Sequence, residues 1–169
     1  MPKKFTPFIK PGEILENEQI QWLREKSDIK GISLLVHAWA VVFLTVFLFS
    51  LFPNVLTFFI AVLVIAGRQL GLAILMHEGA HGLIVNNTKS NDRLSQWICA
   101  FPVWLDTYGY RHYHLAHHRN TQLEDDPDLS LSKPFPVSKL SFLRKALRDI
   151  FGVTGIVQRY ELIFKTLLQ

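Results

Sequence analysis

Residues 55–81 read VLTFFIAVLVIAGRQLGLAILMHEGAH, an apolar run that ends in two histidines four residues apart. Residues 55–76 contain one charged side chain, Arg68, and these 22 residues are enough to cross about 30 Å of hydrocarbon as a helix. If the helix continues into the histidines, His77 lies about 33 Å from Val55, at or just beyond the membrane surface. The stretch therefore predicts a membrane-spanning helix that carries metal-binding side chains at its end.

A second apolar run precedes the first, separated from it by Pro53 and Asn54. Residues 32–52 are 21 residues without a formal charge, and neither run shows a polar face. This favours a transmembrane hairpin over two buried helices of a soluble core. Basic residues flank the hairpin at both ends, so both termini are expected in the cytoplasm. The basic residues are Lys3, Lys4, Lys10, Arg24, Lys26, Lys30, Lys89, Arg93, Arg111 and Arg119.

The sequence predicts an all-α membrane protein in three parts. Residues 1–31 form a cytoplasmic N-terminal segment, residues 32–85 the hairpin, and residues 86–169 cytoplasmic and interfacial helices. The second hairpin helix is expected to reach about residue 85, where Asn86, Asn87 and Thr88 would stop it. Further on, Asn91 and Asp92 are expected to cap a helix over residues 93–101. Basic, amphipathic helices that lie on the membrane surface are expected from residue 139, with breaks at Gly152 and Gly155.

The net charge of +4 is explained by the basic residues beside the membrane, and no basic-aromatic pattern typical of nucleic-acid binding is present. The single cysteine, Cys99, excludes an internal disulfide and a cysteine-based zinc site.

Six of the seven histidines lie between residues 77 and 118. Two of them share a helix face in HEGAH, and three more do so in RHYHLAHH, because side chains three and four residues apart are neighbours on a helix. Neutral imidazole is the commonest metal ligand in proteins and suits zinc, copper, iron and nickel. The candidate ligands are His77, His81, His114, His117 and His118.

The HEGAH motif also fits H-E-x-x-H, in which two histidines hold zinc and Glu78 is the general base of a protease. A catalytic zinc takes three protein ligands and keeps one position open, so five converging imidazoles favour two metal ions. The histidines could also hold a single metal that ties helices together, or line a metal-transport path. The structural metal is the weaker hypothesis because structural zinc sites usually include cysteine, and the transport path is weaker because two spans make a small transport core.

HEGAH at the end of a membrane helix, followed about thirty residues later by YRHYHLAHHRNTQLEDDPDL, resembles the membrane fatty acid desaturase family. The resemblance implies four membrane spans with a cytoplasmic cap and three histidine boxes that hold two iron ions. It also implies that dioxygen is used to desaturate an acyl chain or membrane lipid, with electrons from ferredoxin or cytochrome b5. Related hydroxylases share the boxes. By motif, His77 and His81 would be first-box ligands, and His114, His117 and His118 second-box ligands.

Four further residues are expected to support the ligands. Carboxylates often accept the second N–H of a metal-binding histidine, a role open to Asp125, Asp126 and Asp128. The alternative is a solvated acidic loop around Pro127. His112 lies about 200° round the helix from His114, so it is expected behind the ligands or at an interface.

The family's third box, another H-x-x-H-H, has no counterpart after His118. The chain is therefore expected to be the N-terminal half of a desaturase with an open metal site. It could be inactive alone unless a partner chain supplies the missing box. A membrane zinc metalloprotease and a membrane protein without activity of its own are the competing hypotheses.

Overall fold

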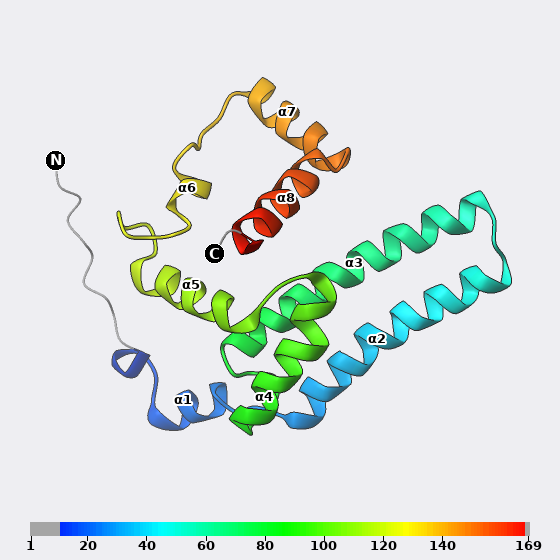
Figure 1. Ribbon diagram of the computed structural model, residues 1–169. Helices are drawn as coiled ribbons and strands as arrows, with labels where there is room; N and C mark the ends of the chain where they lie inside the picture. The colour runs from blue at the N-terminus through cyan, green and yellow to red at the C-terminus, as the bar shows by residue number, and fades with distance from the viewer. Residues whose placement is uncertain (1–10, 168–169) are drawn as a thin grey trace. The chain divides into compact units, whose positions relative to one another are not determined.

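Two long apolar helices, α2 (Asp28–Leu51) and α3 (Val55–Ala80), pack side by side in the computed structural model, which describes residues 11–167 (Figure 1). Each helix begins at a side chain that accepts a backbone N–H of the first turn, Ser27 for α2 and Asn54 for α3. Asn54 and Thr57 exchange two hydrogen bonds, both 3.0 Å long, directly after Pro53. The predicted helical hairpin is therefore confirmed.

Most apolar side chains of the hairpin are exposed. Both helices are long and apolar enough to cross a membrane, yet only 11% of the most apolar window of each is buried. Helices of this composition in a soluble protein would lie in its core, whereas Leu63 and Leu70 are 74% and 65% exposed. The described residues are helical or irregular and contain no strand. The chain is an all-α membrane protein, as the sequence predicts.

A short helix, α1 (Asn17–Leu23), precedes the hairpin and follows a 3-10 turn, η1 (Pro11–Glu13). Lys3, Lys4 and Lys10, on which the predicted orientation partly depends, lie outside the described residues.

Helix α3 ends at Ala80, so the predicted extension to residue 85 is wrong. Gly82 adopts a left-handed φ of 75°, and its N–H donates to the Gly79 carbonyl while the N–H of Leu83 donates to the Glu78 carbonyl. These two hydrogen bonds form a Schellman motif, in which the glycine follows the C-cap residue, here His81, and the last helical residue is Ala80. The prediction overlooked Gly82 as this stop signal.

The residues after α3 form α4 (Thr88–Leu94), a π-helical turn η2 (Ser95–Ala100) and a 3-10 turn η3 (Phe101–Val103). The predicted helix over residues 93–101 is therefore wrong in its start and its type. Asn87 caps α4 by accepting the N–H of Ser90, so the helix starts at Thr88, five residues before the expected start. Asn91, predicted as a cap, is instead fully buried.

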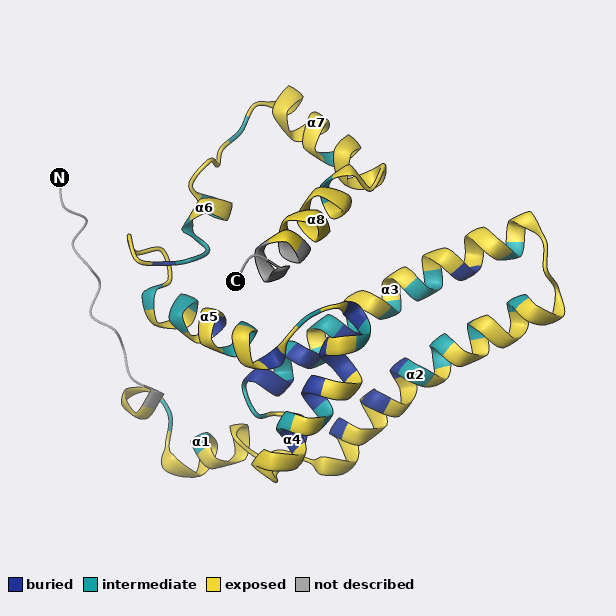
Figure 2. Ribbon diagram, viewed as in Figure 1, coloured by how far each residue is buried: buried dark blue, intermediate teal, exposed yellow. Residues whose placement is uncertain are grey.

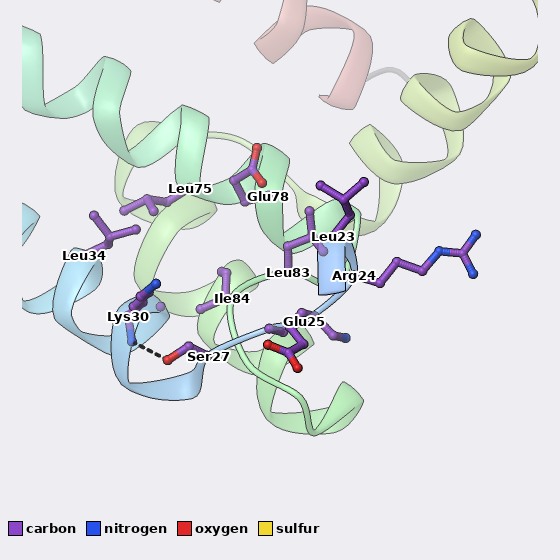
Figure 3. Close-up of a pocket in the computed structure, with 12 residues that line it drawn as sticks. Leu23, Arg24, Glu25, Ser27, Lys30, Leu34, Leu75, Glu78, Leu83 and Ile84 are labelled. Carbon is purple, nitrogen blue, oxygen red and sulfur yellow. Dashed lines mark hydrogen bonds between the residues drawn. The ribbon is translucent and has the colours of Figure 1, made fainter. Parts of the chain in front are cut away.

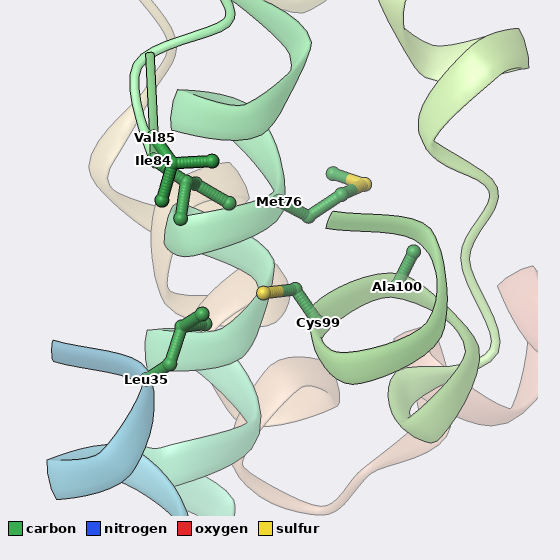
Figure 4. Packing of buried hydrophobic residues seen from close by; sticks show 6 residues of the cluster. All are labelled: Leu35, Met76, Ile84, Val85, Cys99 and Ala100. Atoms are coloured by element: carbon green, nitrogen blue, oxygen red, sulfur yellow. The ribbon is translucent and has the colours of Figure 1, made fainter. Parts of the chain in front are cut away.

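A small core lies where α2, α3 and η2 meet, as the buried residues in Figure 2 show. Burial raises the pKa of the Cys99 thiol to about 12, so this side chain packs as a neutral, apolar group. Figure 4 shows the members of the cluster: Leu35, Met76, Ile84, Val85, Cys99 and Ala100.

The chain divides into two compact units, residues 1–115 and 116–169, and α5 (Thr107–Asn120) runs from one into the other. The second unit continues with α6 (Leu129–Ser132), α7 (Lys139–Ile150) and α8 (Val153–Leu167), of which α7 and α8 pack on each other. The break between them is at Gly152, with a φ of 74°. Gly155 was also predicted to break the chain but lies inside α8, because only Gly152 occupies the left-handed region.

Replacing Gly79 by alanine is expected to destabilise the first unit by about 1–3 kcal/mol. A Cβ atom there would overlap the Ser95 side chain, which packs against α3 at this point. Gly71→Ala is the matched control, since it lies in the same helix with nothing within 4 Å of the added atom. Thermal unfolding in detergent should lower the midpoint for Gly79→Ala only, and equal midpoints for the two variants would contradict this packing.

Candidate metal centre

The last turn of α3 presents two imidazoles side by side. The ring centroids of His77 and His81 are 4.9 Å apart, with the rings at 67° to each other. Because the Schellman turn redirects the chain directly after His81, both rings lie at the tip of the helix.

Helix α5 brings a third imidazole to the same place. The ring centroid of His114 is 4.4 Å from that of His77 and 4.9 Å from that of His81. The Nε2 atoms of His81 and His114 are 2.9 Å apart, and His114 is buried. Imidazoles from two separate stretches of the chain therefore face one another within the first unit.

His118 follows His114 by one turn of the continuous helix α5, so the two side chains lie on one face. One ligand atom from each of His77, His81, His114 and His118 lies within 4.8 Å of the others; we call these four residues the histidine group. Nitrogen ligands about 2.0–2.1 Å from one metal ion are at most about 4.2 Å apart, so small side-chain movements close the group on a metal. An all-imidazole donor set suits iron, zinc, copper and nickel, and the group fits a transition metal.

His117 is not in the histidine group but pairs with a carboxylate in the second unit. Its Nδ1 is 2.7 Å from Oδ1 of Asp126 and 3.5 Å from Oδ2 of Asp128. The buried Asp126 carboxylate also accepts the backbone N–H groups of Gln122 and Asp128, at 2.7 and 2.9 Å. A carboxylate that holds Nδ1–H of an imidazole fixes the tautomer in which Nε2 is the metal-binding atom.

The charges of this pair stabilise each other. The hydrogen bond to Asp126 raises the pKa of His117, and the negative charges of Asp126 and Asp128 add to the effect. Burial pushes the pKa of Asp126 up, but the hydrogen bonds from His117 and the two backbone N–H groups outweigh it and hold that pKa below its usual value.

The remaining predicted site residues are not members of the histidine group. Asp125 and His112 are exposed, and His112 is outside the histidine group. Asp128 reaches His117 only at the longer distance. Glu78 is next to the histidine group, with its Oε1 3.0 Å from Nδ1 of His77.

Two residues that the sequence analysis did not assign to the site hold the end of α3. The buried Asn91 side chain donates to the Gly79 carbonyl at 2.8 Å and accepts the N–H of Ile84 at 3.1 Å. Arg111 donates through Nε to the Ala80 carbonyl at 2.8 Å and through Nη2 to the Gly79 carbonyl at 3.0 Å. These bonds satisfy carbonyls that have no partner inside the helix.

Arg111 connects this end of α3 to His114. It precedes His114 by three residues on α5, so the two side chains share a face. Asp92 on α4 pairs with its guanidinium, and this hydrogen bond raises the pKa of Arg111. In the sequence, Arg111 is predicted only to help set the membrane orientation. Its spacing of three residues from His114 also indicates that it lies on the same helix face as a candidate ligand.

A hollow of about 480 Å³ opens beside His77. The Tyr110 ring at its edge stacks on His114, with centroids 5.0 Å apart and planes 12° apart. The rest of its wall is mainly apolar and includes Ala73, Ile74, Met76 and Leu105.

The chain belongs to the fatty acid desaturase family, whose model matches residues 53–169. This match confirms the resemblance noted in the sequence, and the family is one of oxidoreductases. The chain is also similar to the dihydrorhizobitoxine desaturase of Bradyrhizobium elkanii, with 36% identity over 72 residues. That alignment covers 41% of this chain and 20% of the relative, so the matched part spans about a fifth of the relative's length. No solved structure gives a significant match.

Replacing Arg111 by alanine is expected to weaken metal binding about 10- to 100-fold, the usual cost of losing a residue that supports metal ligands. Arg111→Lys should recover part of the loss, because an ammonium group can still reach one carbonyl. Arg93→Ala, an exposed position on α4, is the control. Titration of the purified chain with Co(II), followed by its absorption bands, measures the affinity. Equal affinities for Arg111→Ala and Arg93→Ala would show that Arg111 does not position the histidines.

Proposed function

We propose that the chain carries metal-binding residues of a desaturase that acts on the hydrocarbon part of a membrane lipid or acyl substrate. The observation that carries the proposal is the histidine group, four imidazoles that two helices bring together at the end of an apolar hairpin. Family membership supports the class of reaction.

The metal in this proposal is iron, two ions in the complete site. His77, His81, His114 and His118 would hold it, and His117, oriented by Asp126, would be a further ligand. Iron bound there would supply the activation of dioxygen needed to remove hydrogens from an unactivated methylene pair. Water has little to bind in the apolar wall beside His77, so that hollow suits a hydrocarbon chain better than a peptide.

The electron donor is proposed to be a ferredoxin or a cytochrome b5-type protein, and both chain termini are proposed to lie in the cytoplasm. Basic side chains of the described residues, such as Arg24, Lys30 and Lys89, flank the ends of α2 and α3 that lie near the histidine group, which supports this orientation.

His114→Ala and His118→Ala are expected to reduce the iron bound by the purified, iron-loaded chain to less than about half, because each removes an imidazole from a group of four. His112→Ala is the matched control, since it is exposed and outside the group. Elemental analysis after gel filtration gives the metal content. Iron retention by His114→Ala at the level of His112→Ala would contradict the proposed ligands.

Glu78→Gln separates the proposed reaction from a zinc protease. A desaturase should keep its iron and its acyl product, because glutamine still offers an oxygen to His77. A protease would keep zinc and lose peptide cleavage, since Glu78 would be its general base. Assays of acyl desaturation and of peptide cleavage decide between them, in membranes that contain the variant together with a chain that supplies the third histidine box. Desaturated and hydroxylated products are distinguished by mass.

A further inference from the structure

A cavity of about 590 Å³ lies where the segment between α1 and α2 passes the loop that ends α3 (Figure 3). One part of its wall is apolar and includes Leu34 of α2, Leu75 of α3 and Leu83 of the loop. The other part is polar and carries the cations Arg24, Lys26 and Lys30. The cavity thus has an apolar wall and a basic rim.

The basic rim is not neutralised by ion pairs. Among residues 11–167, no carboxylate lies within salt-bridge distance of Arg24, Lys26 or Lys30. Lys26 donates from Nζ to the Gly82 carbonyl at 3.1 Å, which leaves its charge unpaired.

Two carboxylates, Glu25 and Glu78, also line the cavity. The Glu78 carboxylate contacts His77, and Figure 3 shows it across the cavity from Lys30. A third nearby carboxylate, that of Asp28, is hydrogen-bonded to Asn86. The rim itself therefore retains an excess of positive charge on the side formed by Lys26 and Lys30.

The cavity lies at the end of the hairpin where the apolar helices give way to charged sequence. Trp22 and Ile29 flank the basic rim and are 70% and 83% exposed. Tryptophan beside basic residues is typical of the headgroup layer of a membrane. Lipid phosphates are therefore available at the level of Lys26 and Lys30, and acyl chains at the level of Leu34.

We propose that this cavity binds an anionic glycerophospholipid of the surrounding bilayer. Its phosphate would lie at Lys26 and Lys30, with Arg24 at the outer edge, and the beginning of an acyl chain would lie against Leu34 and Leu83. The bound lipid would also hold the loop after α3, because Lys26 joins the basic rim to Gly82. This site does not depend on metal at the histidine group.

Native mass spectrometry of the detergent-released full chain tests the proposal, with phosphatidylglycerol and phosphatidylcholine as probes. The chain should bind phosphatidylglycerol about tenfold more tightly than phosphatidylcholine or better, given the attraction of several basic residues for an anionic headgroup. The triple variant Arg24→Gln, Lys26→Gln, Lys30→Gln should lose this preference. The control, Lys139→Gln, Arg144→Gln, Arg148→Gln, removes the same charge from exposed positions of α7 and should keep it.

A second variant, Leu83→Trp, keeps the charges and fills the apolar part of the cavity, so it should weaken phosphatidylglycerol binding as well. Circular dichroism checks that each variant retains its helix content. Equal loss in the α7 control would overturn the proposal in favour of general surface charge. Unchanged binding by Leu83→Trp, or full competition by inorganic phosphate or glycerol phosphate, would overturn it in favour of a simple phosphate site.

Discussion

The carbonyl groups at the end of α3 need hydrogen-bond donors from outside the helix. The residues that supply these donors position the other helices of the first unit. Gly82 turns the chain back, while Asn91 and Arg111 donate to Gly79 and Ala80 from two other helices. Arg111 lies on the same face of α5 as His114. The hydrogen bonds that complete the helix end therefore also hold His114 beside His77 and His81.

Polar contacts matter here because the buried apolar clusters of the first unit are small. Asn91, Ser95 and Thr107 are among the largest fully buried side chains, and Ser95 and Thr107 hydrogen-bond each other at 2.9 Å. Among the described residues, no buried side-chain nitrogen or oxygen lacks a hydrogen-bond partner. A satisfied polar network of this kind specifies one arrangement of short helices, whereas the apolar faces of α2 and α3 remain free to contact lipid.

The hairpin, the all-α class and the family could be predicted from the sequence, because long apolar runs and i, i+4 histidines are local patterns. The end of α3 was mispredicted because Gly82 was overlooked in favour of the polar residues after it. Asn91 was mispredicted because an asparagine that caps a helix and one that bonds a distant carbonyl look alike in sequence. The sequence offers three aspartates for the carboxylate role without separating them, because which of Asp125, Asp126 and Asp128 lies nearest a histidine depends on the fold of the chain after α5.

X-ray absorption spectroscopy of the iron-loaded chain tests the central claim most directly, since the fine structure counts the imidazoles around the metal. The histidine group predicts at least about two imidazole nitrogens per iron, at metal–ligand distances near 2.1 Å. A first shell made only of oxygen, without the scattering pattern of imidazole rings, would contradict the claim that the ends of α3 and α5 together form a metal site.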